Sequence, residues 1–107
     1  MNCSEVINGL RYILTEAELD KVRVKSKDKE EYLFVDLHGL TTKEAERFTN
    51  NIVNIARGEG VIAFCHGFNH GTAIKELLVN KKYSSRVVCK ESPSYNPGLT
   101  YFKISAA

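Results

Sequence analysis

The sequence lacks a hydrophobic run long enough to cross a membrane, because no apolar stretch approaches the roughly 18 residues that a bilayer requires. Its start, MNCSEVINGLRYIL, also lacks the basic segment and the small-residue cleavage site of a secretory signal peptide. We therefore expect a cytoplasmic protein with no membrane partner.

Cysteine is scarce, with three residues and no close pair. Cytoplasmic thiols normally stay reduced, so the sequence does not predict a disulfide framework. We interpret Cys65 and Cys89 as small hydrophobic residues on buried strands. The competing interpretation is a catalytic thiol at Cys65 beside His66, but neighbouring residues on a strand point to opposite faces and do not easily share a proton.

No strong excess of one charge is present either: the formal net charge is +2, with 26% charged and 43% hydrophobic residues. These values are typical of globular proteins and remove the support for a disordered, coiled-coil or collagen-like chain. A length of 107 residues fits one compact domain. The net charge permits a polyanionic partner without requiring one, because a local basic face matters more than the sum.

Helical spacing of apolar residues predicts a first amphipathic helix over SEVINGLRYILTEAEL, with Ser4 as its N-cap. The charged segment from Asp20 to Glu31 is either a solvated linker or a short edge strand around Val22 to Val24. We place the domain boundary here, with residues 1–31 as an N-terminal extension and residues 32–107 as the main domain.

Strand and helix patterns alternate in the main domain. Short apolar runs predict strands at YLFVDL, VIAFCH, RVVCK and LTYFKI, and helical spacing predicts helices over residues 40–60 and 71–80. Thr41 and Glu44 form a capping box at the start of the first helix, and Gly58 ends it. The order βαβαββ predicts an α/β two-layer sandwich, with a four-stranded, mostly parallel or mixed sheet, two helices and the additional N-terminal helix.

Polar residues follow the first two of these strands, in the stretches DLHG and CHGFNHGT. Functional groups of open α/β sheets gather at the carboxyl ends of the strands. Asp36 and His38 are two residues apart and therefore share a face, and His66 ends the second strand. If the two strands are neighbours, these three side chains come within reach of one another. The alternative is that Asp36 and His38 only cap the helix and bind backbone.

Glycines in both stretches call for positive φ or close backbone approach, and unpaired amides at a helix start attract anions such as phosphate. His66 and His70 could instead form a two-ligand metal clip, but the intervening Gly67 and Asn69 favour a loop over a helix face, and we predict no metal ligand. The predicted phosphate contacts are Gly39, Lys43, Gly67, Asn69, His70, Gly71, Thr72 and Lys75.

The segments VDLHGLTTKEAE, VIAFCHGFNHGTAIKELL and NPGLTYFKI together resemble the small MutS-related (Smr) domain family, over about Tyr32 to Ile104. The resemblance implies a fold like the C-terminal domain of bacterial translation initiation factor three. It also implies nucleic-acid binding and, in some members, nicking or cleavage of DNA or RNA, including mRNA on stalled ribosomes. The suspected catalytic pair of the family corresponds to Asp36 and His38, and its glycine-rich loop corresponds to His66 to Gly71, with Asn69 in place of the second glycine.

Our first hypothesis is a phosphodiesterase that acts on RNA or DNA. His38 would be the general base or acid, Asp36 would orient it or hold a divalent ion, and His66 would be a second proton carrier or phosphate ligand. RNA suits a metal-free route because its 2′-hydroxyl is an internal nucleophile, whereas DNA nicking would call for Mg or Mn.

The second hypothesis is a non-catalytic module that binds RNA, DNA or the ribosome. A third possibility is a homodimer through the N-terminal helix, whose apolar face must be covered by its own chain or by a second copy. The residues that support the binding module are the basic Lys75, Lys81, Lys82, Arg86 and Lys90, and Tyr83 and Tyr95 as stacking surfaces.

Overall fold

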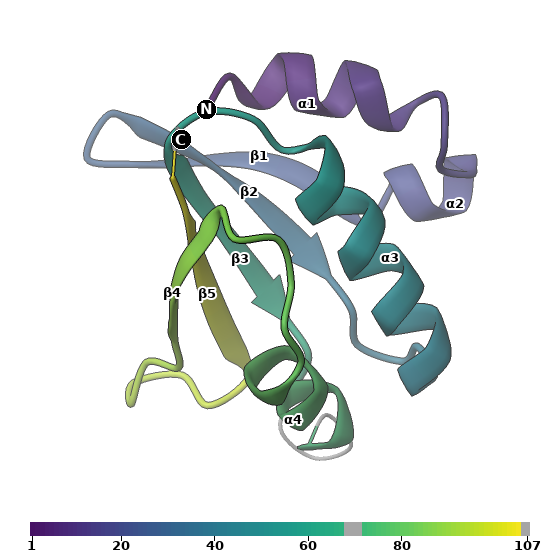
Figure 1. The fold of residues 1–107 in the computed structure, drawn as a ribbon, viewed down its shortest axis with the longest axis vertical. Coiled ribbons are helices and arrows are strands. Elements are labelled where there is room, and N and C mark those ends of the chain that lie inside the picture. Colours follow the sequence, from purple (N-terminus) through teal and green to yellow (C-terminus); the bar gives the residue numbers. More distant parts are fainter. Residues whose placement is uncertain (68–71, 106–107) are drawn as a thin grey trace.

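The structure, a computed structural model that describes residues 1–67 and 72–105, has a five-stranded sheet with helices on one face (Figure 1). The strand order is β1-β2-β3-β5-β4, and only β2 and β3 are parallel. The elements are α1 (Cys3–Leu10), α2 (Glu16–Leu19), β1 (Val22–Lys27), β2 (Glu30–Asp36), α3 (Thr42–Ile55), β3 (Gly60–Cys65), α4 (Thr72–Asn80), β4 (Val87–Glu91) and β5 (Leu99–Ile104).

The predicted α/β class and mixed sheet are confirmed, and the two helices predicted in the main domain correspond to α3 and α4. The sheet has five strands and not four, and the N-terminal helix is divided into α1 and α2. The additional strand is β1, in the charged segment that the sequence left open as linker or edge strand. It pairs antiparallel with β2, with Val22 opposite Val35, and Val22 is buried. Asp28 and Lys29 both have positive φ, which is the backbone of a tight two-residue hairpin turn. The alternation of valine with basic residues in VRVKSK is therefore a strand pattern.

The N-terminal helix is shorter than predicted. Asn2, not Ser4, is the N-cap of α1, and its side chain accepts a hydrogen bond from the backbone N–H of Glu5 at 3.1 Å. A second helix, α2, starts at a capping box formed by Thr15 and Glu18. Two separate caps therefore divide the segment that the apolar spacing had joined into one helix.

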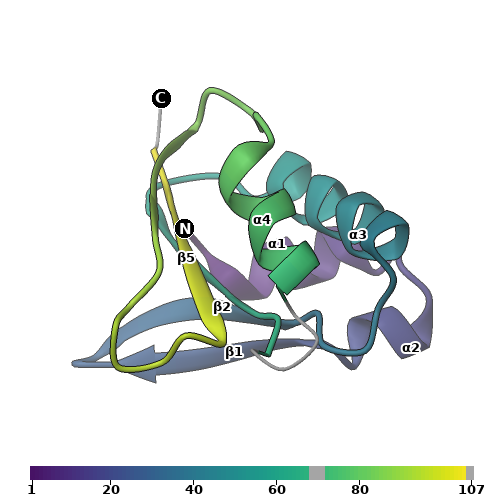
Figure 2. The same ribbon diagram turned by 90° about the horizontal axis from the view of Figure 1, so that it is seen from below.

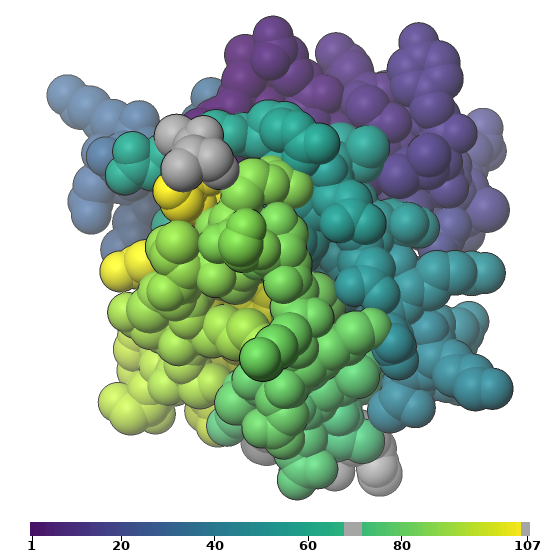
Figure 3. All heavy atoms as spheres, in the orientation of Figure 1, coloured from purple at the N-terminus to yellow at the C-terminus, as the bar shows by residue number. Residues whose placement is uncertain are grey.

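The apolar face of α1 is covered by its own chain, since α1 packs on α3 and on the first two strands. Figure 2 shows α1, α3 and α4 on the same side of the sheet, and in Figure 3 they cover this face together with the segment that follows α4, in light green. The apolar face of the N-terminal helix therefore does not need a second copy of the chain to cover it, and that need was the reason for predicting a homodimer. Residues 1–31 share the sheet and core of the remaining chain, and the boundary after residue 31 stays a prediction.

The core lies between the sheet and the helices. Strand residues alternate between this core and the opposite, open face of the sheet: Leu33 and Val35 of β2 are buried, whereas Phe34 between them is only half-buried. The helical faces that close the core agree with the predicted spacing. Their buried residues are Cys3, Val6 and Leu10 of α1, Ala45, Phe48, Ile52 and Val53 of α3, and Ile74 and Leu78 of α4.

Two further sequence predictions need adjustment. The capping box of Thr41 and Glu44 is present, but α3 ends at Ile55 and not at Gly58, which has a φ of 83° beyond the helix. Cys65 and Cys89 lie on strands as expected, but both are only half-buried and no cysteine forms a disulfide. Within the described ranges, no helix has the length and apolar character that a membrane span needs.

Candidate functional site

Asp36 and His38 form a hydrogen-bonded pair where β2 ends. Oδ1 of Asp36 accepts from the backbone N–H of His38 at 3.1 Å and also pairs with Nδ1 of the imidazole. Because a carboxylate only accepts, Nδ1 carries the proton and Nε2 is left as the acceptor. The His38 side chain is 67% exposed and that of Asp36 is 33% exposed, so Nε2 is open to a ligand from solvent.

The two polar turns lie side by side, as the sequence predicts for neighbouring parallel strands. The N–H of Leu37 donates to the carbonyl of Cys65 at 2.7 Å and so extends the β2–β3 pairing into the turns. A Cβ placed on Gly67 would lie 3.9 Å from Cβ of His38. Gly39 and Gly67 have φ values of 82° and 73°, which confirms the predicted left-handed backbone.

His66 does not share this surface. Its side chain points to the helix side of the sheet and its residue is 2% exposed. Nδ1 donates to the carbonyl of Gly67 at 2.7 Å, and Nε2 accepts from Oγ1 of Thr100 at 2.9 Å. Burial lowers the pKa of His66 from its ordinary value of 6.5, and the nearby charge of Lys75 lowers it further, against the opposing effect of the Gly67 hydrogen bond. His66 is therefore a neutral residue with both ring nitrogens occupied.

The amides expected to receive a phosphate in the second turn are also partly occupied. The backbone N–H groups of His66 and Gly67 both donate to the carbonyl of Gly98, at 2.9 and 3.2 Å. The loop before β5 thus uses the N–H of Gly67, which the sequence had assigned to an anion, together with that of His66. Asn69, His70 and Gly71 lie outside the described residues.

Most of the basic residues in the second half of the chain stabilise the fold. Arg86 donates to the carbonyls of Val53, at 2.9 Å, and Ala56 at the end of α3. Lys90 donates to the carbonyls of Val79, in the last turn of α4, and Lys81, directly after it, at 3.2 and 2.6 Å. These cations satisfy carbonyl groups that a helix end leaves unpaired. Lys81 pairs with Glu46, and Tyr83 packs against Phe102 with ring centroids 5.3 Å apart. Lys82 is the exposed member of this group.

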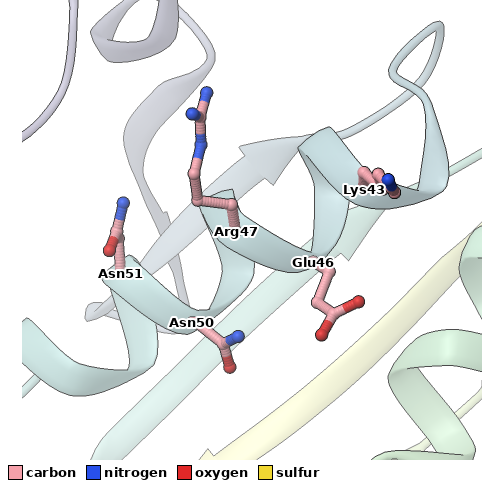
Figure 4. A pocket seen from close by; sticks show the side chains of 5 residues that line it. All are labelled: Lys43, Glu46, Arg47, Asn50 and Asn51. Atoms are coloured by element: carbon pink, nitrogen blue, oxygen red, sulfur yellow. The ribbon is translucent and has the colours of Figure 1, made fainter.

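Lys43 is exposed on the first turn of α3 and lines a shallow hollow with Glu46, Arg47, Asn50 and Asn51 (Figure 4). Arg47 and Asn51 point to one side of the helix and Glu46 and Asn50 to the other, so the side chains do not converge on a common ligand. Thr72 and Lys75 lie at the start of α4, where Thr72 is exposed and Lys75 is half-buried.

Sequence reasoning missed a set of aromatic residues on the open face of the sheet. Tyr32 and Phe34 alternate with the buried Leu33 along β2, and Tyr101 lies on the same face of β5. The period-two alternation in EEYLFVD was the available signal, but the apolar run YLFVDL was used only to predict a strand and not to assign its two faces. Only the register between strands brings Tyr101 level with Phe34.

The described residues of the candidate site offer few side chains that could bind a divalent ion. Among residues 1–67 and 72–105, no group of three or more His, Cys, Asp or Glu side chains is placed to hold a metal. Asp36 is the carboxylate at the candidate site, and one of its oxygens is engaged by His38. These residues do not fit a Mg or Mn site.

Comparisons of the chain with family models, with curated proteins and with solved structures find no match.

Proposed function

We propose that this protein binds nucleic acid in the cytoplasm and cleaves RNA at a phosphodiester bond, with His38 as the general base. The observation that carries the proposal is the Asp36–His38 pair, in which the carboxylate holds the proton on Nδ1 and leaves an exposed Nε2 free to accept one. The resemblance of both turns to the small MutS-related family agrees with this assignment.

The reaction follows from the free Nε2. His38 takes the proton of the 2′-hydroxyl, the 2′-oxygen forms a bond to phosphorus, the bond from phosphorus to the 5′-oxygen breaks, and that oxygen takes a proton from solvent. Asp36 stabilises the imidazolium that forms. His66 has no part in proton transfer here, because it is buried and both its nitrogens are bonded.

Replacing His38 with Ala tests the proposal. The cleavage rate of a labelled single-stranded RNA should fall by about 10²- to 10⁴-fold, the usual contribution of a positioned acid–base group. The melting temperature should stay nearly unchanged, because the side chain is exposed. Arg11→Ala is the control, because Arg11 is an exposed residue next to the end of α1 with no role in the proposed site. Retained cleavage in the His38 variant would remove His38 from the mechanism.

A non-catalytic module that binds RNA, DNA or the ribosome is the second candidate, and the burial of His66 favours it. The first hypothesis called for two accessible imidazoles, those of His38 and His66, but of these two residues only His38 is exposed. Incubation of the wild-type protein with RNA and with supercoiled DNA, with and without Mn, separates the candidates. Binding of RNA without cleavage under every condition would support the module.

A further inference from the structure

The open face of the sheet displays aromatic and basic side chains in two adjacent rows. Strand register determines which residues stand level with one another, and odd and even positions alternate between the two faces. One row is Arg23, Phe34, Ala63, Tyr101 and Glu91, and the next is Lys25, Tyr32, Val61, Lys103 and Cys89.

The first row contains a continuous aromatic surface. Ala63 is 1% exposed although it lies on the open face, so the side chains around it, with Phe34 and Tyr101 on its two flanking strands, close over it. Tyr95, 72% exposed, extends this surface because its hydroxyl bonds that of Tyr101 at 3.0 Å. The same hydrogen bond, with burial, raises the pKa of Tyr101 to about 12, so the Tyr101 ring stays neutral at physiological pH.

Positive charge without an acidic partner lies at one end of this surface. Nζ of Lys25 is 3.7 Å from the ring centroid of Phe34, and Arg23 is the direct neighbour of Phe34 on β1. Neither cation forms an ion pair with a described residue, whereas Lys103 pairs with Glu91 at 3.5 Å at the other end of the rows. The surplus charge is therefore concentrated on β1.

The aromatic surface leads to the Asp36–His38 pair. Asp36 is two residues beyond Phe34 on β2 and points to the same face, level with Cys65 of β3. The Asp36–His38 pair therefore lies next to Phe34 in the direction of β2. A broad hollow of about 1200 Å³ lies over the second row, and its lining combines Tyr32, Tyr101 and Lys103 with the carboxylates of Asp28, Glu30, Glu31, Glu59 and Glu91. Phosphates are therefore expected on the β1 side of the aromatic surface and not in this hollow.

We propose that the open sheet face binds single-stranded RNA, with bases stacked on Phe34 and Tyr101 and phosphates on Arg23 and Lys25. The Lys25 ammonium group, which lies over the Phe34 ring in this structure, moves to a phosphate when a base stacks there. Stacking on strand aromatics requires unpaired bases, since a duplex hides their faces. RNA is chosen over DNA because the inference rests on the proposed function, in which the 2′-hydroxyl is the nucleophile. Sequence preference is not expected, because every base can stack.

Fluorescence anisotropy of the full chain with a labelled, unstructured RNA of about 12 nucleotides, within the usual site size, tests the proposal. The double variant Phe34→Leu/Tyr101→Leu keeps apolar cover over Ala63 and removes both aromatic rings. Its affinity should fall by about 25-fold or more, the expectation for two lost base stacks. Tyr12→Leu is the matched control. Tyr12 is 90% exposed and lies beyond α1, so this variant should bind RNA with the affinity of the wild type.

A second variant tests the cations. Arg23→Gln/Lys25→Gln should weaken binding and reduce the slope of log affinity against log salt by about 1.4, or about 0.7 for each lost phosphate contact. Arg11→Gln, at an exposed cation next to the end of α1, should leave the slope unchanged. An unchanged affinity of the Leu double variant overturns the proposal even if His38→Ala abolishes cleavage. A reduced RNA affinity of the Leu double variant supports the proposal even if His38→Ala still cleaves RNA.

The same measurements also test other ligands and a second copy of the chain as occupants of the open sheet face. Tighter binding of duplex RNA than of single strands overturns the proposal, and so does tighter binding of single-stranded DNA of the same sequence. A wild-type dimer in light scattering that the Leu double variant converts to monomer overturns it as well, because the face would then cover a second copy.

Discussion

One oxygen of Asp36 holds His38 at two points, the backbone N–H and the imidazole Nδ1. The first contact fixes where the residue leaves β2, and the second fixes how its ring is turned. A two-residue spacing on a strand permits both, since the two side chains lie on the same face. The arrangement makes the carboxylate a positioning group as well as a charge.

The two roles of Asp36 can be separated with Asp36→Asn. The amide oxygen can still accept both hydrogen bonds, so the turn should keep its shape and the melting temperature should change little. Loss of the negative charge removes the stabilisation of the imidazolium, and the cleavage rate should fall by about tenfold or more, part of the roughly 10²- to 10⁴-fold effect of an acid–base group. Single-turnover cleavage at saturating RNA measures this. An unchanged rate would restrict Asp36 to positioning.

His66 should make stability depend on pH. Its pKa is lowered in the folded protein, so below the ordinary value of 6.5 the unfolded chain binds a proton that the folded chain does not. Stability should therefore be highest above that pH and should decrease as the pH falls through it. The difference in urea midpoint between wild type and His66→Gln isolates this residue from the other histidines. The two curves should converge as the pH falls, and parallel curves would contradict the prediction.

Arg86 should contribute to stability and not to nucleic-acid binding. Arg86→Met removes a charged donor from the carbonyls of Val53 and Ala56 at the end of α3. We expect the free energy of unfolding to decrease by about 1.5–3 kcal/mol, as for other hydrogen bonds to charged groups. Arg86→Lys should recover only part of this, because a lysine lacks the planar fork. Urea denaturation measures the change, and a loss of RNA affinity at unchanged stability would reverse the assignment.

A side chain has enough space at Gly39, but the backbone conformation there is unfavourable for an L-residue. Its φ is 82°, and a Cβ at this position would meet nothing within 4 Å. Gly39→Ala should therefore lower the free energy of unfolding by about 1–2 kcal/mol, the cost of a left-handed backbone in an L-residue. Gly39→Asn should cost less, because asparagine tolerates this region better. Chemical denaturation of both variants gives the comparison, and an alanine variant as stable as wild type would contradict it.

Local patterns were sufficient for several features of this protein. Apolar runs predicted β3 and β5, the capping box of Thr41 and Glu44 predicted the start of α3, and the glycines of both turns predicted left-handed backbone. These features depend on a few consecutive residues, whose periodicity and steric preferences act at short range.

Only the tertiary structure decided which of the predicted site residues face one another. His66 belongs to the correct turn, but strand alternation and the hydroxyl of Thr100 hold its ring in the core. Arg86 and Lys90 appear free in the sequence, yet Lys90 binds carbonyls at the end of the preceding helix and Arg86 binds carbonyls at the end of α3, which is distant along the chain. Phe34 and Tyr101 became neighbours across Ala63 through register. Such contacts are set by pairing between distant strands, and a local sequence pattern contains no information about that pairing.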